Sequence, residues 1–512
     1  MAIIPSIIKW LNNNRMEQID LFREHPFETQ EQELFNLLDK ASGTEWGRMY
    51  DFRSIGNADT FRKRLPLQKY EDIAPQIERL RGGETNIMWP GTIRWFAKSS
   101  GTTNSKSKFI PVSDESLEDC HYKGARDTLV FYASRFSDSG IFRGKGLTLG
   151  GSHRVTSFNN DALYGDLSAI LIENAPFYVN LIKTPRSDIA LLEDFNEKLQ
   201  KITTVAINEN VTSLTGVPSW YLVLLRHILD HTGKENILEV WPNLEVFFHG
   251  GINFEPYRDI YRQLIPSESM RYMESYNASE GFFALQDDLS SSDMLLMLDY
   301  GVYYEFIPLS ELNKSDNPPS LLINEVEQGV SYAIVITTNG GLWRYLIGDT
   351  VTFTSLYPHK IKLTGRTKLF INAFGEEVVI DNAERAITNA CRKTGAAVSE
   401  YTAGPVYMNA SEKGSHEWIV EFESEPDDIE MFRRILDETL QSVNSDYEAK
   451  RMNNNTLLPP VVRVVPQGTF LKWFEKKNKL GGQNKMPRLS NDRTYIEDFY
   501  SIAGLAAEAP GQ

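Results

Sequence analysis

The sequence predicts an α/β protein with a large layered N-terminal domain and a small α+β C-terminal domain. The chain has 512 residues, of which 41% are hydrophobic, so it exceeds the size at which one core keeps growing. Between Leu147 and Val240, short apolar runs alternate with helical patterns, as in layered α/β domains. Later, a shorter strand-helix-strand-helix-strand pattern predicts a ferredoxin-like lid. We expect an N-terminal domain over residues 1–365 and a mobile lid over 366–512.

The elements of the N-terminal domain follow from local patterns. Its first hundred residues alternate helical segments with polar breaks, and the leucines of residues 29–40 recur at helical spacing. Ser113 follows a strand over residues 109–112 and is placed to cap the next helix. Further elements are a helix over 218–231 and strands over 169–172, 203–207, 244–248 and 332–337.

The C-terminal pattern is shorter and self-contained. We expect a helix over 381–393 that ends at Gly395, and a helix that places Phe432, Ile435, Leu436 and Leu440 on one face. The expected strands are 378–380, 417–423 and 461–465, the second with Trp418, Val420 and Phe422 on one face.

Charge and cysteine content limit the class of partner and the compartment. A formal net charge of −16 disfavours broad binding of nucleic acid or anionic lipid, because the global field repels polyanions. The two cysteines, Cys120 and Cys391, form no paired motif, which favours a reducing compartment. No apolar run approaches the roughly 18 residues of a membrane span. We therefore expect a soluble, cytoplasmic protein with no nucleic-acid or membrane partner.

Residues 99–103, Ser-Ser-Gly-Thr-Thr, follow an apolar run and precede Lys106 and Lys108. Hydroxyl side chains around a glycine allow a tight loop to direct O–H and N–H groups at phosphate oxygens. The segment predicts a phosphate-binding loop made of Ser99, Ser100, Gly101, Thr102 and Thr103. A polar turn between two strands is the alternative for this motif taken alone.

A second motif places Tyr276 four residues before Glu280, with Ser279 between them. An aromatic ring can stack on a base, and Mg²⁺ prefers one or two carboxylates together with phosphate oxygens. Glu280 is therefore the candidate metal ligand, and Tyr276 and Ser279 are candidate nucleotide contacts. The alternative is a surface turn with a glutamate that starts a helix.

Two further segments carry groups suited to a nucleoside. An apolar run over residues 343–349 is expected to end as a strand at Asp349, whose carboxylate could accept both ribose hydroxyls. Arg366 could add a charge-assisted contact. Gly250 and Gly251 follow a predicted strand and permit close approach of a flat ligand such as adenine. Ordinary turns and a solvated arginine are the alternatives.

Near the C-terminus, a glycine-led loop ends at Pro487 and presents Lys485 on a long stem. Such a lysine can bridge a substrate carboxylate and an α-phosphate as negative charge develops between them. Other lysines lie nearby, so a solvated, lysine-rich face is the alternative.

In this order the motifs resemble the Gretchen Hagen family of acyl-acid amido synthetases, the auxin-conjugating branch of the luciferase-like adenylate-forming superfamily. The resemblance runs from Ser99 to Arg488. It implies an adenylate-forming N-terminal domain with a mobile lid, in which ATP adenylates a small carboxylic acid and the acyl group then passes to an amino acid. It further implies that Glu280 holds Mg²⁺, Asp349 the ribose, and Lys485 the adenylation step.

The sequence also departs from that family pattern. Asn277 and Ala278 stand where the family has Gly-Ser, and Leu346 stands where it usually has an arginine. Two other functions therefore stay open: an acyl-CoA ligase, which shares the first step, and a catalytically silent protein that binds a nucleotide or an acid. Residues 212–225 could line an apolar acid pocket, although plain core is the alternative. Pocket residues decide the acid, so the sequence does not name it.

Overall fold

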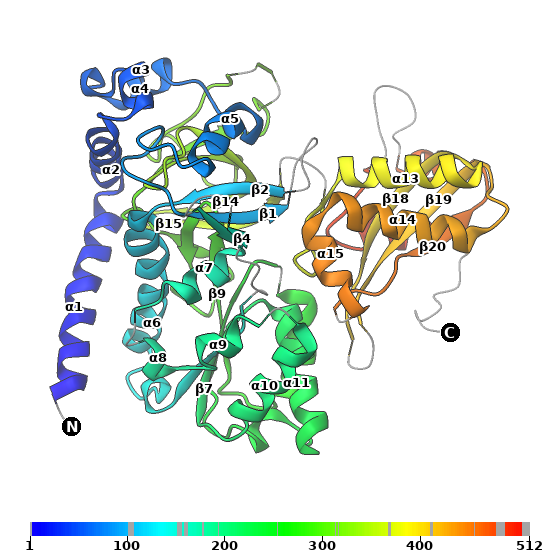
Figure 1. The fold of residues 1–512 in the computed structure, drawn as a ribbon, viewed down its shortest axis with the longest axis horizontal. Helices are drawn as coiled ribbons and strands as arrows, with labels where there is room; N and C mark the ends of the chain where they lie inside the picture. Colours follow the sequence, from blue (N-terminus) through cyan, green and yellow to red (C-terminus); the bar gives the residue numbers. More distant parts are fainter. Residues whose placement is uncertain are drawn as a thin grey trace.

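The computed structural model consists of a larger N-terminal part and a smaller C-terminal part beside it, coloured yellow to red in Figure 1. The α/β class expected from the sequence is confirmed. The described residues are 3–100, 107–150, 156–157, 162–176, 179–192, 194–252, 254–312, 314–315, 317–366, 370–409, 413–454, 456–477 and 487–503.

Helices form the N-terminal end of the chain, as the alternation of helical segments and polar breaks predicts. They are α1 (Ile3–Glu24), α2 (Pro26–Ala41), α3 (Glu45–Met49), α4 (Ala58–Arg64) and α5 (Tyr70–Arg81). Helix α2 buries Leu34, Leu37 and Leu38, which confirms the face predicted from their spacing. In the part of the chain that the structure describes, no helix is both long enough and apolar enough to cross a lipid bilayer.

An eleven-stranded sheet forms the centre of the N-terminal part. It is antiparallel from β12 to β9 and parallel from β9 to β6. In spatial order its strands are β12 (Val302–Pro308), β13 (Ser331–Thr338), β14 (Tyr345–Leu356), β15 (His359–Arg366), β11 (Met294–Leu296), β10 (Gly281–Leu285), β9 (Arg271–Ala278), β8 (Val246–Gly250), β7 (Val211–Gly216), β3 (Lys145–Thr148) and β6 (Lys183–Thr184).

The antiparallel half of this sheet is curled. Strands β14 and β9 are four positions apart in the sheet, which in a flat sheet would separate them by about 19 Å. Nevertheless, the hydroxyl of Tyr276 on β9 donates to Asp349 Oδ2 on β14 at 2.5 Å. A chain of aromatic contacts crosses the interior of the curl, through Tyr276, Phe283, Tyr304, Phe306 and Phe353. The curl therefore brings together strands that are distant in sheet order.

Helices cover the parallel half, and here two sequence predictions fail. Helices α10 (Phe195–Ala206), α11 (Pro218–Thr232) and α12 (Arg258–Leu264) pack against β3, β7 and β8. Residues 169–172 and 203–207 were expected as strands, but they lie in α7 (Leu167–Glu173) and at the end of α10. A short buried apolar run fits either element, because periodicity alone does not separate them.

A smaller four-stranded sheet lies beside the large one and carries the start of the predicted phosphate loop. Its order is β2 (Ser107–Val112), β1 (Trp95–Ser100), β5 (Leu163–Gly165) and β4 (Thr156–Ser157). After β2, the backbone N–H of Ser116 donates to Ser113 Oγ at 2.9 Å. The predicted N-cap of the helical segment that continues into α6 (Lys123–Arg135) is thus confirmed.

A buried ion pair joins the N-terminal helices to the sheet. Arg344 and Glu305 are 2% and 1% exposed, and Nε and Nη2 of Arg344 lie 3.0 and 3.1 Å from the two carboxylate oxygens. Nη1 of Arg344 also donates to the carbonyl oxygens of Arg62 and Leu65 at 2.8 and 2.6 Å. Because Arg344 directly precedes β14, these bonds fix the start of the strand that carries Asp349.

The C-terminal part is built on a three-stranded sheet in the order β18 (Ala397–Val406), β19 (Ser415–Ser424), β20 (Val461–Val465). The α+β character is as expected. The sequence prediction omitted β18, however, and residues 378–379 form β17, which pairs with β16 (Phe370–Ile371) in a separate sheet. Helices complete this part: α13 (Ile380–Thr394), α14 (Ile429–Val443), α15 (Ser445–Arg451), α16 (Thr469–Lys476) and α17 (Thr494–Ala503).

The two faces of this sheet carry different helices. Trp418, Val420 and Phe422 of β19 share a core with α13 and α14, as the alternation along this strand predicts. The intervening Ile419 packs with residues of α16 and α17. Helix α13 ends at Gly395, which has a φ of 71°, because glycine adopts this left-handed conformation without steric cost.

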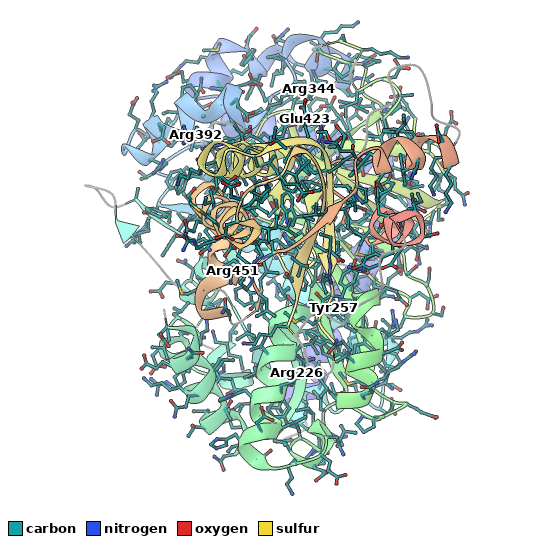
Figure 2. The ribbon with its side chains drawn as sticks, turned by 90° about the vertical axis from the view of Figure 1, so that its right-hand side faces the viewer. Arg226, Tyr257, Arg344, Arg392, Glu423 and Arg451 are labelled. Carbon is teal, nitrogen blue, oxygen red and sulfur yellow. The ribbon has the colours of Figure 1, made fainter. Side chains whose placement is uncertain are left out.

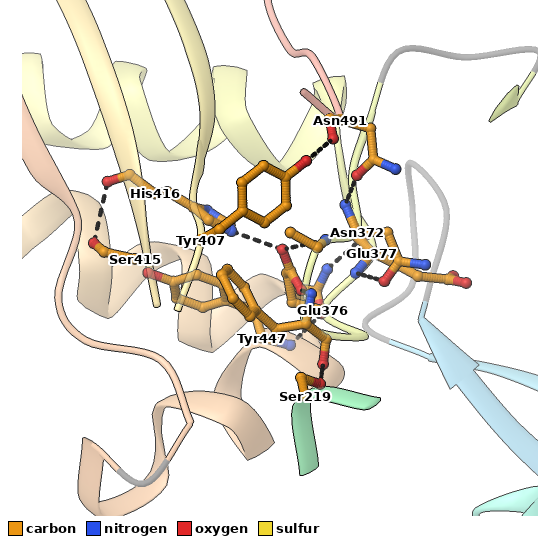
Figure 3. A network of polar contacts seen from close by, with 12 residues as sticks. Ser219, Asn372, Glu376, Glu377, Tyr407, Ser415, His416, Tyr447 and Asn491 are labelled. Carbon is orange, nitrogen blue, oxygen red and sulfur yellow. Dashed lines mark hydrogen bonds and ion pairs between the residues drawn. The ribbon is translucent and has the colours of Figure 1, made fainter. Parts of the chain in front are cut away.

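The loop of residues 372–377 joins the two parts, and a buried carboxylate organises it. Glu376 accepts from the backbone N–H groups of Ala373 and Phe374 at 3.1 and 2.7 Å and from His416 Nε2 at 2.8 Å (Figure 3). The hydroxyl of Tyr257, in the N-terminal part, donates to the carbonyl oxygen of Ala373 at 2.6 Å. In Figure 2 the C-terminal part faces the viewer, with Tyr257 at its lower border. These bonds place the loop against the N-terminal part.

Replacing Arg344 by methionine tests the buried ion pair. It leaves the Glu305 carboxylate buried without its cation, so we expect a loss of about 3–5 kcal/mol in the free energy of unfolding. Chemical denaturation measures this loss. The matched control is Arg135→Met, because the ion pair of Arg135 with Asp288 is exposed and is expected to contribute far less to stability. Equal losses in the two variants would contradict the role assigned to the buried pair.

Candidate functional site

A cleft of about 1630 Å³ lies between the two parts of the chain. Strands β8, β9, β14 and β15 contribute to its walls, and so do Gly375 and residues of α15 from the C-terminal part. The sequence-predicted site residues that line this cleft are Ser99, Gly250, Gly251, Tyr276, Ser279, Glu280 and Asp349. Segments far apart in the sequence therefore meet around one space.

Some predicted site residues fall outside the described residues. These are Gly101, Thr102, Thr103 and Lys485. The backbones of Ser100 and Arg366 are described, but their side chains are not. Ser100 pairs with Ser107 at the end of β1, and Arg366 pairs with Asp349 at the end of β15. The strand ends that flank the predicted phosphate loop thus border the cleft, where Ser99 and Lys108 are lining residues.

Asp349 lies inside a strand, which corrects the expectation that it ends one. Strand β14 continues to Leu356. Opposite β13 the register shifts, because Leu346 pairs with Val335 whereas Thr350 pairs with Ala333. The bulge between these pairs contains Gly348, which has a φ of 96°. A bulge redirects side chains, and here it accompanies a carboxylate that lines the cleft.

Tyr276 and Asp349 form the polar centre of the site. Tyr276 is buried, and its hydroxyl donates to Asp349 Oδ2 at 2.5 Å. This bond orients the carboxylate, and a carboxylate is an acceptor that suits the hydroxyls of a ribose. The sequence predicted both residues as nucleotide contacts, but not the bond between them.

The departures from the family pattern have local explanations. Asn277 Oδ1 accepts a hydrogen bond from His121 Nδ1 at 3.0 Å. Burial lowers the pKa of His121 to about 4, so the ring is neutral at physiological pH. Leu346 packs against the cluster of Ile307, Ala333 and Val335. At position 277 the chain therefore has an amide that pairs with the neutral His121 ring, and at position 346 it has an apolar side chain in place of the family's cation.

Gly250 is required by strand pairing whether or not a ligand approaches it. A Cβ at this position would collide with the carbonyl oxygen of Ser275 on the neighbouring strand β9. Gly251 has a φ of 82°, which favours glycine. Both residues line the cleft.

The carboxylate of Glu280, at the tight turn between β9 and β10, fits a divalent cation. It lines the same cleft as Ser99 and Asp349. The described residues contain no group of three or more His, Cys, Asp or Glu side chains arranged to hold a metal ion. This composition suits Mg²⁺ held by one carboxylate and phosphate oxygens, and it does not suit a site built from protein ligands alone.

The sequence analysis missed a polar pair on the wall of the cleft. His249 and Glu274 face each other in the register of β8 and β9, and both line the cleft. The His249 ring stacks on Phe254 at 4.2 Å between centroids. Burial raises the pKa of the Glu274 carboxyl to about 7 and lowers that of His249 to about 3. No motif marks these two residues in the sequence.

Comparison with protein-family models matches three parts of the chain. The GH3 family N-terminal domain matches residues 15–270, the GH3 family central domain residues 295–366, and the GH3 family C-terminal domain residues 381–494. The matched segments include Ser99, Gly250, Gly251, Asp349 and Arg366 among the predicted site residues.

Curated relatives and solved structures agree with these matches. The indole-3-acetic acid-amido synthetase GH3.4 of Arabidopsis thaliana is 24% identical, over 92% of this chain and 90% of that protein. The 4-substituted benzoates-glutamate ligase GH3.12 of the same plant is 22% identical, over 84% and 87%.

Among solved structures, the GH3.15 acyl acid amido synthetase superposes with a TM-score of 0.58 at 18% identity, over 93% of both chains. A 2-hydroxyisobutyryl-CoA ligase in complex with 2-HIB-AMP and CoA gives a TM-score of 0.57 at 12% identity, over 93% of both chains. At these identities the likeness establishes the fold.

Replacing Glu274 by glutamine tests the polar wall. The pKa of this carboxyl is about 7 in the folded protein and 4.5 in its usual range. Between pH 4.5 and pH 7, therefore, the unfolded chain has released the Glu274 proton while the folded chain still holds it. The folded state consequently loses stability as the pH rises through this window. Glutamine removes that loss. We expect the stability of Glu274→Gln relative to the unsubstituted protein to rise by about 1–3 kcal/mol between pH 5 and pH 8.

Denaturation at the two pH values measures the difference. Glu255→Gln is the matched control, because Glu255 is an exposed glutamate on the same wall. A gain in Glu274→Gln that is the same at both pH values would rule out the raised pKa.

Proposed function

This chain belongs to the GH3 family, and on that premise we propose that it is an ATP-dependent acyl acid amido synthetase. The enzyme adenylates a small carboxylic acid and releases pyrophosphate. It then transfers the acyl group to the amino group of an amino acid and releases AMP. The names of its relatives, amido synthetases and a benzoate-glutamate ligase, support this reaction class.

One observation carries the proposal: Ser99, Tyr276, Glu280 and Asp349 line a single cleft. A hydroxyl at the edge of a Ser/Thr-rich loop suits phosphate oxygens, and a carboxylate oriented by a tyrosine suits a ribose. A nucleoside triphosphate carries both kinds of group. The cleft volume of about 1630 Å³ also leaves room for an acid and an amine beside the nucleotide.

Activation is needed because a carboxylate does not form an amide with an amine at neutral pH. In the first step an oxygen of the acid attacks the α-phosphorus, the bond to the β-phosphate oxygen breaks, and pyrophosphate leaves. In the second step the amine attacks the acyl carbon, and AMP leaves with the electrons of the C–O bond. Asp349, held by Tyr276, keeps the ribose in place through both steps.

Charge stabilisation in the first step is assigned to two residues. Glu280 would hold Mg²⁺, which supplies positive charge next to the phosphates. Lys485 would approach the acid carboxylate and the α-phosphate as charge develops between them. We assign Lys485 from its place in the sequence motif, and we propose that it belongs to a mobile lid over residues 366–512 that closes on a domain over residues 1–365.

We also propose a reducing compartment, the cytoplasm. Cys120 is buried, Cys391 is partly buried, and both are free thiols. Free thiols persist where disulfides do not form.

A screen of carboxylic acids for AMP release tests the reaction class. Each acid is incubated with ATP and Mg²⁺, and with a mixture of amino acids, coenzyme A, or neither acceptor. We expect at least one acid to give AMP that depends on amino acids, and mass spectrometry to find the amide. AMP release that depends on coenzyme A would identify an acyl-CoA ligase. Nucleotide binding without turnover of any acid would indicate a silent binding protein.

The role of Lys485 gives a sharper prediction. Lys485→Ala is expected to slow acid-dependent exchange of pyrophosphate into ATP by about 100-fold or more, because it removes a charge needed in the transition state. Lys472→Ala, an exposed lysine on the nearby α16, is the matched control and is expected to exchange normally. Unchanged exchange in Lys485→Ala would remove the assigned role.

A further inference from the structure

The C-terminal part places one cation inside the cleft. Lys450, on α15, is 8% exposed and lines the cleft. Its Nζ lies 4.2 Å from the centre of the Trp220 ring, on α11 of the N-terminal part. The backbone of Gly375 also passes close to the Lys450 side chain, because a Cβ added at Gly375 would lie 3.3 Å from Lys450 Cε. The ammonium is therefore held between the two parts of the chain.

Lys450 differs from the other buried cations among the described residues, each of which has a hydrogen-bond partner; Lys183, for example, donates to Ser187 Oγ at 3.5 Å. Arg344 and Arg451 each face a carboxylate with two nitrogens, and Lys198 donates to the carbonyl oxygen of Gly150 at 2.8 Å. Within the described residues, no hydrogen bond and no ion pair within 4.0 Å reaches the ammonium of Lys450. A buried charge without a hydrogen-bond or ion-pair partner is costly, so the position is suited to an anionic ligand.

The groups around Lys450 limit which anion fits. Asp166, Glu377 and Asp446 line the same cleft, and each favours the charged form of Lys450 through its negative charge. Glu376 also acts on it, although that carboxylate accepts bonds within its own loop. A polyphosphate would be repelled by this many carboxylates. A small zwitterion would not, because its anion can meet the ammonium while its cation meets a carboxylate.

We propose that Lys450 binds the α-carboxylate of the amino-acid acceptor, and that the carboxylates beside it accept hydrogen bonds from the acceptor's amino group. This inference rests on the proposed function and deepens it. It assigns the acceptor subsite to the corner of the cleft between α15, α11 and Asp166. It makes Lys450 a positioning residue, because the group that it binds takes no part in the bond changes.

The chemistry of the second step is consistent with this arrangement. The acceptor's ammonium first gives one proton to a neighbouring carboxylate. The amine nitrogen then bonds to the acyl carbon, the C–O bond to AMP breaks with its electrons on the AMP oxygen, and the nitrogen passes its second proton to the departing AMP phosphate as the amide forms. The α-carboxylate keeps its charge throughout, so its contact with Lys450 persists. Burial lowers the pKa of Lys450, and a bound carboxylate would raise it again and hold the proton on the ammonium.

The position of Lys450 also ties the acceptor to the arrangement of the two parts. Lys450 and Glu377 come from the C-terminal part, whereas Trp220 and Asp166 come from the N-terminal part. The subsite is therefore complete only when the loop of residues 372–377 is in contact with the N-terminal part, as it is in this structure. Adenylation itself does not use the subsite.

The experiment compares Lys450→Met, which keeps the stem and removes the charge, with Lys450→Arg, which keeps the charge. Lys201→Met is the matched control, because Lys201 is exposed on α10. Two rates are measured: acid-dependent pyrophosphate exchange without acceptor, and AMP release as a function of acceptor concentration. The acceptors are the best amino acid from the screen and its carboxamide, which lacks the negative charge.

We expect Lys450→Met to keep exchange within about twofold and to raise the KM for the amino acid by 10-fold or more, with a smaller change in kcat. The preference for the amino acid over its carboxamide is expected to collapse in Lys450→Met, to persist in Lys450→Arg and to be unchanged in Lys201→Met. If Lys450 had only a structural role, Lys450→Met would lower kcat/KM for the amino acid and for its carboxamide by the same factor.

An unchanged preference in Lys450→Met, with exchange intact, would overturn the acceptor assignment alone. A loss of pyrophosphate exchange in Lys450→Met, or a raised KM for the carboxylic acid, would assign Lys450 to the first step. Either result would also overturn the acceptor assignment. If the unsubstituted protein shows no exchange with any acid, the proposed function fails first and this inference fails with it.

Discussion

The hydrogen bond between Tyr276 and Asp349 is the interaction on which the site depends. It joins β9 to β14, which are four positions apart in the sheet, so it can form only because the sheet is curled. Aromatic side chains, packed mostly edge to face, fill the inside of the curl and resist its flattening. The fold therefore acts through one geometric constraint: it brings Asp349, the residue to which we assign the ribose, to the same cleft as Ser99 near the end of β1 and Glu280 after β9.

Buried charges where the parts of the molecule meet also hold the site in place. Arg344 and Glu305 fix the start of β14 against the N-terminal helices, and Glu376 shapes the loop that contacts Tyr257. Both carboxylates have their hydrogen bonds satisfied within the protein, as burial requires. Lys450 has no such partner among the described side chains. Of these buried charges, Arg344, Glu305 and Glu376 hold the architecture, whereas we propose that Lys450 meets a ligand.

Local signals in the sequence predicted much of the fold and part of the site. Ser113 is a cap, Pro218 starts a helix, and residues 461–465 form a strand, because these depend on nearest neighbours. The strands expected over residues 169–172 and 203–207 are helices, since a short buried run fits either element. The bond from Tyr276 to Asp349 depends on the curl, and Lys450 lies in a charged segment typical of a solvated helix. Neither can be found from spacing.

Calorimetric titration with a hydrolysis-resistant ATP analogue and Mg²⁺ tests the central claim most directly. The geometry predicts one site per chain, a loss of at least 10-fold in affinity in Asp349→Ala, and a smaller loss in Tyr276→Phe, where the carboxylate remains but is no longer oriented. The absence of heat in the unsubstituted protein, or equal affinities in all three proteins, would contradict the assignment of this cleft to a nucleotide.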